Sequence, residues 1–228
     1  MKIISDIRLY KSDIDNINGN SLPSGFSDRS LNLTVRRIAM KLREYSFSLG
    51  EFDHLYLNFT NCLPDGTIEP AKRTVDRYSP WYRYYDIGVS QDVFVHLGSE
   101  NTVPKMLELI KQTLIQYFVL DENDKKVIDT AINAVVTNGS KTLMRFKEKK
   151  AAKTTAVIYL QLLDTAGYLP IISVCDLQGK ELLRENLPET FDLSSIGEIQ
   201  LSSKKITVKP RKNAFAQNLE PISFSFNL

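Results

Sequence analysis

Residues 30–60 read SLNLTVRRIAMKLREYSFSLGEFDHLYLNFT, and the spacing of their apolar side chains changes within this segment. The first half predicts a helix over residues 30–46, because its apolar side chains recur every three or four positions on one helical face. These side chains are Leu31, Val35, Ile38 and Leu42. Residues 52–60 instead alternate apolar and polar types, which is typical of a half-buried strand. We therefore expect the helix to pack its apolar face on a sheet that contains this strand.

The segments around this unit extend the pattern. Residues 2–9 are rich in β-branched side chains and predict a first strand, whereas residues 13–25 collect the Asp, Asn, Gly, Ser and Pro of a loop. Pro64-Asp65-Gly66 predicts a turn, because proline presets the first central position and glycine accepts a positive φ. Residues 81–90 are aromatic and predict another strand, which we expect to pair near residues 52–60.

Two helices are predicted next, followed by a series of strands. Thr102 is the expected cap of the first helix, Asp121 or Asn123 that of the second, and Gly139 the residue that ends it. Their short connection predicts an antiparallel pair. Beyond it the sequence favours an antiparallel meander. Its predicted strands are residues 142–150, 155–163, 168–176, 181–185, 198–201, 206–209 and 221–228.

These elements predict an α+β fold, with an N-terminal strand-helix-strand region, a central antiparallel helix pair and a C-terminal antiparallel β meander. The chain has 228 residues, a length at which one large domain or two small ones can bury a core. We expect a single α+β domain over residues 1–228. The alternative is a division near residues 139–141 into a mixed N-terminal half and a β-rich C-terminal half.

Composition narrows the class of protein. Hydrophobic residues make up 43% and charged residues 25% of the chain, which is typical of a folded globular protein. The sequence begins without a signal-like apolar run and contains no apolar stretch long enough to cross a bilayer, so we expect a cytoplasmic protein that does not enter membranes. Cys62 and Cys175 are far apart and are expected to be free thiols.

Motifs for metals, cofactors and phosphate groups are missing from the sequence. His54 and His96 are 42 positions apart, and neither cysteine has a histidine at metal-ligand spacing, so no metal site is predicted. His96 is expected at the end of a short helix. Neither glycine-rich phosphate-binding pattern occurs, and we therefore expect no cofactor.

Positive charge is concentrated in two stretches, although the net charge is only +2. Residues 141–153 contain six Lys or Arg against the single Glu148, and residues 204–212 contain five against no acid. Lysines on edge strands resist edge-to-edge aggregation, which is the interpretation that needs no ligand. An acidic protein partner and a nucleic acid are the alternatives, and we expect nucleic-acid binding to be absent.

The most unusual segment is YSPWYRYYD, residues 78–86, which contains the single tryptophan of the chain. In a strand, Trp81, Arg83 and Tyr85 would face one side, and Tyr82, Tyr84 and Asp86 the other. Three interpretations are open, namely core and cross-strand packing, a face that binds a partner, and a stacking platform for a sugar or a base. The residues predicted to bind a partner are Trp81, Tyr82, Arg83, Tyr84 and Tyr85.

His54 is the candidate for an enzymatic role. It could act as a general base if Asp86 or Asp76 oriented its ring. Asp53 is excluded as that partner in this interpretation, because adjacent strand residues point to opposite faces. No nucleophile motif accompanies the histidine, so a structural or surface role is favoured and no catalytic residue is predicted.

The layout of the chain resembles the immunity proteins of bacterial polymorphic toxin systems. The shared features are Pro23-Ser24-Gly25-Phe26 before a helix, the strand of residues 52–60, the aromatic strand of residues 81–90 with its Asp-Ile-Gly-Val ending, and a β-rich C-terminal half. The resemblance implies a protein that binds a cognate toxin and occludes its active site, without catalytic residues of its own. Inhibitors of basic nuclease toxins are often acidic, whereas this chain has a pI near 8.4, so the toxin class stays open.

Three functional hypotheses are open. The first is an immunity protein that uses the aromatic face around residues 81–85. The second is an enzyme of unrecognised type that uses His54 with Asp86 or Asp76. The third is a nucleic-acid-binding accessory protein that uses the two basic stretches. Neither the oligomeric state nor the identity of the toxin follows from the sequence.

Overall fold

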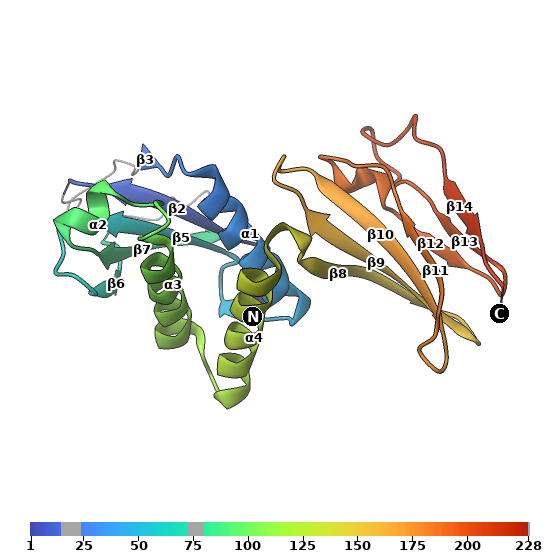
Figure 1. Ribbon diagram of the computed structural model, residues 1–228, viewed down its shortest axis with the longest axis horizontal. Coiled ribbons are helices and arrows are strands. Elements are labelled where there is room, and N and C mark those ends of the chain that lie inside the picture. Colours follow the sequence, from blue (N-terminus) through green and yellow to red (C-terminus); the bar gives the residue numbers. More distant parts are fainter. Residues whose placement is uncertain (15–23, 73–79, 228) are drawn as a thin grey trace. The chain divides into compact units, whose positions relative to one another are not determined.

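The structure is a computed structural model that describes residues 1–14, 24–72 and 80–227 (Figure 1). It has the α+β fold that the sequence predicts. The chain divides into two compact units, unit 1 with residues 1–139 and unit 2 with residues 140–228. No helix among the described residues is both long and apolar enough to cross a membrane.

Unit 1 is built on a five-stranded mixed sheet in the order β3-β2-β5-β7-β6. The central strands β2, β5 and β7 run parallel, and β3 and β6 pair antiparallel at the two edges. A two-stranded ribbon of β1 (Lys2–Ile3) and β4 (Ser48–Gly50) lies outside this sheet. The bounds of the five strands are Asp6–Ser12 for β2, Ser24–Gly25 for β3, His54–Thr60 for β5, Ile68–Pro70 for β6 and Tyr82–Gly88 for β7.

Helix α1 (Arg29–Glu44) connects β2 to β5 and begins at Asp28, whose carboxylate accepts a hydrogen bond of 2.6 Å from the Leu31 amide. This bond satisfies one of the amides that a helix start leaves without a partner. The apolar face expected from the sequence is confirmed, since Leu31, Val35, Ile38 and Leu42 are all buried in one core cluster with the sheet. The crossover between parallel strands is therefore made by α1.

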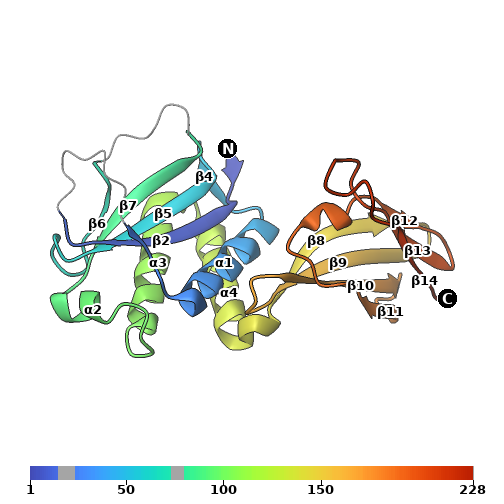
Figure 2. The same ribbon diagram turned by 90° about the horizontal axis from the view of Figure 1, so that it is seen from above.

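The remaining helices of unit 1 are α2 (Gln91–Val95), α3 (Val103–Phe118) and α4 (Glu122–Asn138). Figures 1 and 2 show α3 and α4 as an antiparallel pair on one side of the sheet, as predicted. Asp121 caps α4 through a 3.0 Å hydrogen bond from the Asp124 amide. Thr102 is the N-cap residue of α3, as predicted, but its side chain caps no amide of the helix, because its hydroxyl donates to the His96 carbonyl at 2.8 Å.

The core of unit 1 lies between the helices and one face of the sheet. Every second residue of the strands points into this core. The fully buried ones include Leu55, Leu57, Phe59 and Ile87. Since successive side chains point to opposite faces, the other residues of the same strands line the opposite face. That face carries polar and aromatic groups, and it is the candidate binding site described below.

Gly88, at the end of β7, approaches the turn that follows β5 more closely than a side chain allows. An added Cβ would lie 2.0 Å from the Pro64 carbonyl oxygen, and the Gly66 amide donates to the Gly88 carbonyl at 2.9 Å. We expect Gly88→Ala to destabilise unit 1 by at least about 1 kcal/mol, because the turn must move away. A thermal melt followed by Trp81 fluorescence measures this change, and an unaltered midpoint would show that the approach is not required.

Unit 2 consists of two antiparallel sheets, between which the predicted meander is divided. The first has the order β11-β10-β9-β8 and begins after a short 3₁₀ turn, Gly139–Lys141. Its strands are β8 (Leu143–Lys150), β9 (Thr154–Leu162), β10 (Tyr168–Asp176) and β11 (Glu181–Asn186). The second sheet, in the order β12-β13-β14, contains β12 (Ile199–Leu201), β13 (Lys205–Val208) and β14 (Ile222–Ser225), and β12 contacts β8 (Figure 2). A 3₁₀ turn, Leu193–Ser195, precedes β12.

A polar aromatic face in unit 1

The three parallel strands place their outward side chains in rows across the sheet. Strand pairing aligns residues 6, 54 and 82 in one row, residues 8, 56 and 84 in the next, and residues 10, 58 and 86 in a third. We call this surface the tyrosine face. Its members are Asp6, Arg8, Tyr10, His54, Tyr56, Asn58, Tyr82, Tyr84 and Asp86.

The tyrosine rings of the face are held by one another. Tyr56 and Tyr82 stack with centroids 4.9 Å apart and an interplanar angle of 11°, and Tyr84 meets Tyr56 edge-on at 5.1 Å. The ring centroid of Tyr10 lies 5.4 Å from the ring centroids of both Tyr56 and Tyr84. Offset and edge-on ring pairs of this kind stabilise a fold by more than the burial of their surface area alone. Tyr56 and Tyr84 are only 7% and 8% exposed, so they form the floor of the face.

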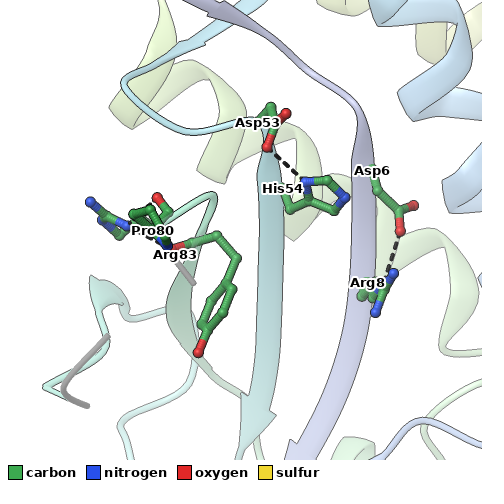
Figure 3. Close-up of polar contacts among 7 residues, drawn as sticks. Asp6, Arg8, Asp53, His54, Pro80 and Arg83 are labelled. Carbon is green, nitrogen blue, oxygen red and sulfur yellow. Dashed lines mark hydrogen bonds and ion pairs between the residues drawn. The ribbon is translucent and has the colours of Figure 1, made fainter. Parts of the chain in front are cut away.

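A cation lies over this floor. The Arg8 guanidinium carbon is 5.4 Å from the Tyr56 centroid, and Arg8 Nε donates to the Asp6 carboxylate at 2.8 Å (Figure 3). The hydrogen bond to Asp6 raises the pKa of Arg8, and burial raises the pKa of the Tyr56 phenol. Arg8 is therefore charged and Tyr56 neutral at physiological pH, which gives the face a fixed cation beside hydroxyl donors.

His54 has a carboxylate partner, and the exclusion of Asp53 was wrong. His54 Nδ1 lies 2.7 Å from Asp53 Oδ1 (Figure 3). Alternation does not apply here, because Asp53 precedes β5, and its carbonyl accepts the Ser5 amide at 2.7 Å instead of joining the regular ladder. The short distance fits a hydrogen bond in which the imidazole N–H donates to the carboxylate.

The orienting partners predicted for His54 are not supported. Asp86 accepts a 2.7 Å hydrogen bond from Asn58 Nδ2, and Asp86 lies four positions further along β7 than Tyr82, the residue paired with His54. At about 3.3 Å per residue this separates Asp86 from His54 by roughly 13 Å along the strand. Asp76, the other predicted partner, lies outside the described residues.

The residues predicted to bind a partner fall into two groups. Trp81 is 42% exposed and meets the half-buried Tyr82 edge-on at 6.4 Å, so these two can be reached from solvent. Tyr84 belongs to the floor of the tyrosine face. Tyr85 is 8% exposed in the core, 4.7 Å from the Tyr117 ring, and is excluded from direct binding.

Arg83 points to the same side of the sheet as Tyr85. Its guanidinium carbon lies 5.3 Å from the Phe52 centroid, and Nη1 donates to the carbonyls of Tyr82 at 2.8 Å and Pro80 at 3.1 Å (Figure 3). These contacts indicate that Arg83 fixes the start of β7. The predicted alternation is thus confirmed for residues 82–86, and it removes Arg83 and Tyr85 from the tyrosine face. Trp81, which was predicted on the side of Arg83 and Tyr85, precedes β7 and is not part of the strand. Residues 78 and 79 lie outside the described residues.

Sequence reasoning missed the part of the face that β2 contributes. Arg8 and Tyr10 alternate with the buried Ile7 and Leu9, a pattern that was available in the sequence. This pattern does not give the order of the strands in the sheet. Only the pairing of β2 with β5 brings Tyr10 beside Asn58.

Asn58 supplies an acceptor within the face. Its side chain is buried at 2% exposure, and its Oδ1 accepts no hydrogen bond among the residues that the structure describes. A buried carbonyl oxygen without a donor costs free energy. Within the same described ranges, His, Cys, Asp and Glu form no cluster of three or more that could hold a metal ion.

The two basic stretches also meet, within unit 2. Lys147 Nζ donates to the carbonyls of Ile196 and Gly197, and burial together with the charge of Arg211 lowers the pKa of Lys147. Strand β8 is an edge strand with Lys149 and Lys150 exposed, which agrees with edge protection.

No family model, curated protein or solved structure matches this chain.

Proposed function

We propose that this chain is an immunity protein that binds a cognate bacterial toxin through the tyrosine face and occludes the toxin's active site. The observation that carries the proposal is the pairing of a rigid aromatic floor with accessible Trp81 and Tyr82 at its edge. Tryptophan, tyrosine and arginine dominate the binding energy of protein interfaces, because they supply large rigid contact area with a polar handle. A floor that is already packed loses little side-chain entropy on binding.

The geometry favours a protein partner over a sugar or a base. Tyr56 and Tyr82 each use one ring face to stack on the other, so each ring has only one face left for a planar ligand. A protein surface can instead cover the exposed Trp81 edge and pair an acidic group with Arg8, whose side chain is 54% exposed. Charged groups at the rim of an interface mainly improve specificity and the association rate.

The experiment co-expresses the full chain with the product of the gene adjacent to its own and scores survival of the host. Binding is then measured by titration calorimetry of the two purified proteins. The proposal requires both protection and a saturable complex. A neighbour that is harmless when expressed alone, or a toxin that the chain neither binds nor blocks, would contradict it.

The contact between Asp53 and His54 favours a second candidate, an enzyme that uses His54 as a general base. The immunity proposal expects His54→Ala to retain full protection although His54 belongs to the tyrosine face, because a few aromatic and arginine side chains carry most of the energy of an interface. Catalysis would instead be reduced by about a hundredfold or more. Asp53→Asn is the matched control, since it keeps the shape of the pair and removes its charge. Loss of protection in both variants, with unchanged melting curves, would count against the binding proposal.

A further inference from the structure

A second candidate site lies in unit 2, within the long connection between β13 and β14. Residues 209–221 form a pocket of about 490 Å³, a volume within the usual range of ligand sites. Hairpin connections are usually two to five residues long, and longer ordered ones are frequently functional. This loop therefore needs an explanation beyond joining two strands.

The loop is held in place by hydrogen bonds to the segment before β12. The Arg211 amide donates to the Ser194 carbonyl at 2.7 Å, and Asn213 Nδ2 donates to Ser194 Oγ at 3.1 Å. Gly197 permits this approach, since a Cβ there would lie 2.5 Å from the Pro210 carbonyl carbon. Ala216, within the loop, is buried at 3% exposure. The pocket is thus part of the folded unit.

The lining of the pocket combines apolar and cationic side chains. The cationic ones are Lys209, Arg211 and Lys212, and the apolar ones are Pro210, Ala214, Ala216, Leu219 and Pro221. None of the lining residues, all of which the structure describes, carries a carboxylate, although Glu220 follows Leu219 in the chain. The positive electrostatic potential around Arg211 is reinforced by Lys147. The pKa of Lys147 is lowered by burial and by the nearby charge of Arg211.

Unit 2 as a whole has the same sign of charge. Residues 140–228 contain 13 Lys or Arg and 9 Asp or Glu, whereas residues 1–139 contain 16 and 18. The positive charge therefore belongs to the unit that holds the pocket. A complementary ligand carries acidic groups for the cationic side chains and an apolar group for the apolar part of the lining.

We infer that this pocket binds an acidic, extended segment of a protein partner that inserts one apolar side chain between Leu219 and Pro210. The lining favours such a segment over a nucleic acid, because the described residues that form it include apolar side chains and no aromatic ring on which an unpaired base would stack. The inference concerns unit 2 alone and does not rest on the function proposed for the tyrosine face.

The test is a fluorescence-anisotropy titration of the full chain with a short labelled peptide of Asp and Glu that has one central Leu. We expect saturable binding, weakened about tenfold or more by Arg211→Glu with Lys212→Glu. The matched control is Lys204→Glu with Lys205→Glu, which makes the same charge change in the same basic stretch outside the pocket lining and should change the affinity less than about threefold.

A second variant separates the apolar contact from general charge attraction. Leu219→Ser should weaken the Leu peptide but leave unchanged a peptide in which Ser replaces the central Leu, and this holds even if the double charge variant does not fold. No saturable binding by the wild type, equal weakening by both charge variants, or displacement of the peptide by a thymidine oligonucleotide at lower concentration would each overturn the inference.

Discussion

Leu42→Ala is expected to lower the free energy of unfolding of unit 1 by about 2 to 5 kcal/mol. Leu42 is fully buried at 0% exposure where α1 meets the sheet, so the smaller side chain loses transfer free energy and leaves a cavity. The measurement is urea unfolding followed by Trp81 fluorescence. The single tryptophan lies in unit 1, and its signal therefore reports on that unit.

Leu120→Ala is the matched control for this prediction. Leu120 is 74% exposed between α3 and α4, and the same truncation there removes few contacts. Its midpoint should stay within the equivalent of about 0.5 kcal/mol of the wild type. If Leu42→Ala left the urea midpoint where Leu120→Ala leaves it, the packing of α1 on the sheet would be refuted.

If the chain binds a toxin as proposed, Trp81→Ala is expected to weaken that binding by about 2 kcal/mol or more, which is roughly a thirtyfold rise in Kd. Trp81 combines 42% exposure with an edge-on contact to Tyr82, so its removal takes away contact area and one support of that ring. Calorimetry with the purified toxin measures the affinity, and circular-dichroism melts of the variant alone separate lost binding from lost folding.

Tyr45→Ala provides the control for aromatic truncation. Tyr45 is 40% exposed at the end of α1, on the opposite side of the sheet from the tyrosine face. We expect it to bind the toxin as the wild type does. Should Trp81→Ala and Tyr82→Ala both retain wild-type affinity and protection, the interface would lie elsewhere on the protein.

The spacing of apolar residues along the sequence was sufficient to predict the main helices and strands and which side of each is buried. The spacing of Leu31, Val35, Ile38 and Leu42 located α1 and its buried face. A helix that buries one face needs apolar residues every three or four positions, and this period can be seen in the sequence. The alternation over residues 82–86 likewise separated Tyr82 and Tyr84 from Tyr85. These are local properties of the chain.

Backbone detail at element ends escaped the same reasoning. Asp53 was assigned to the strand and hence to the face opposite His54, yet it precedes β5 and turns its carboxylate to the imidazole. Thr102 is the N-cap residue of α3, but its hydroxyl bonds the turn before it instead of an amide of the helix. At the ends of elements the partners of a side chain are set by neighbours that periodicity does not describe.

The sequence by itself determined which residues form helices and strands, which side of each is buried, and that aromatic and basic residues are concentrated locally. Tertiary structure decided the composition of the sites. The parallel order of β2, β5 and β7 gathers Arg8, Tyr56 and Tyr84 in one row, and the return of residues 209–221 brings Arg211 toward Lys147. Contacts between residues this far apart depend on strand order and loop path, which are fixed by how all the apolar faces are buried together and not by any one segment.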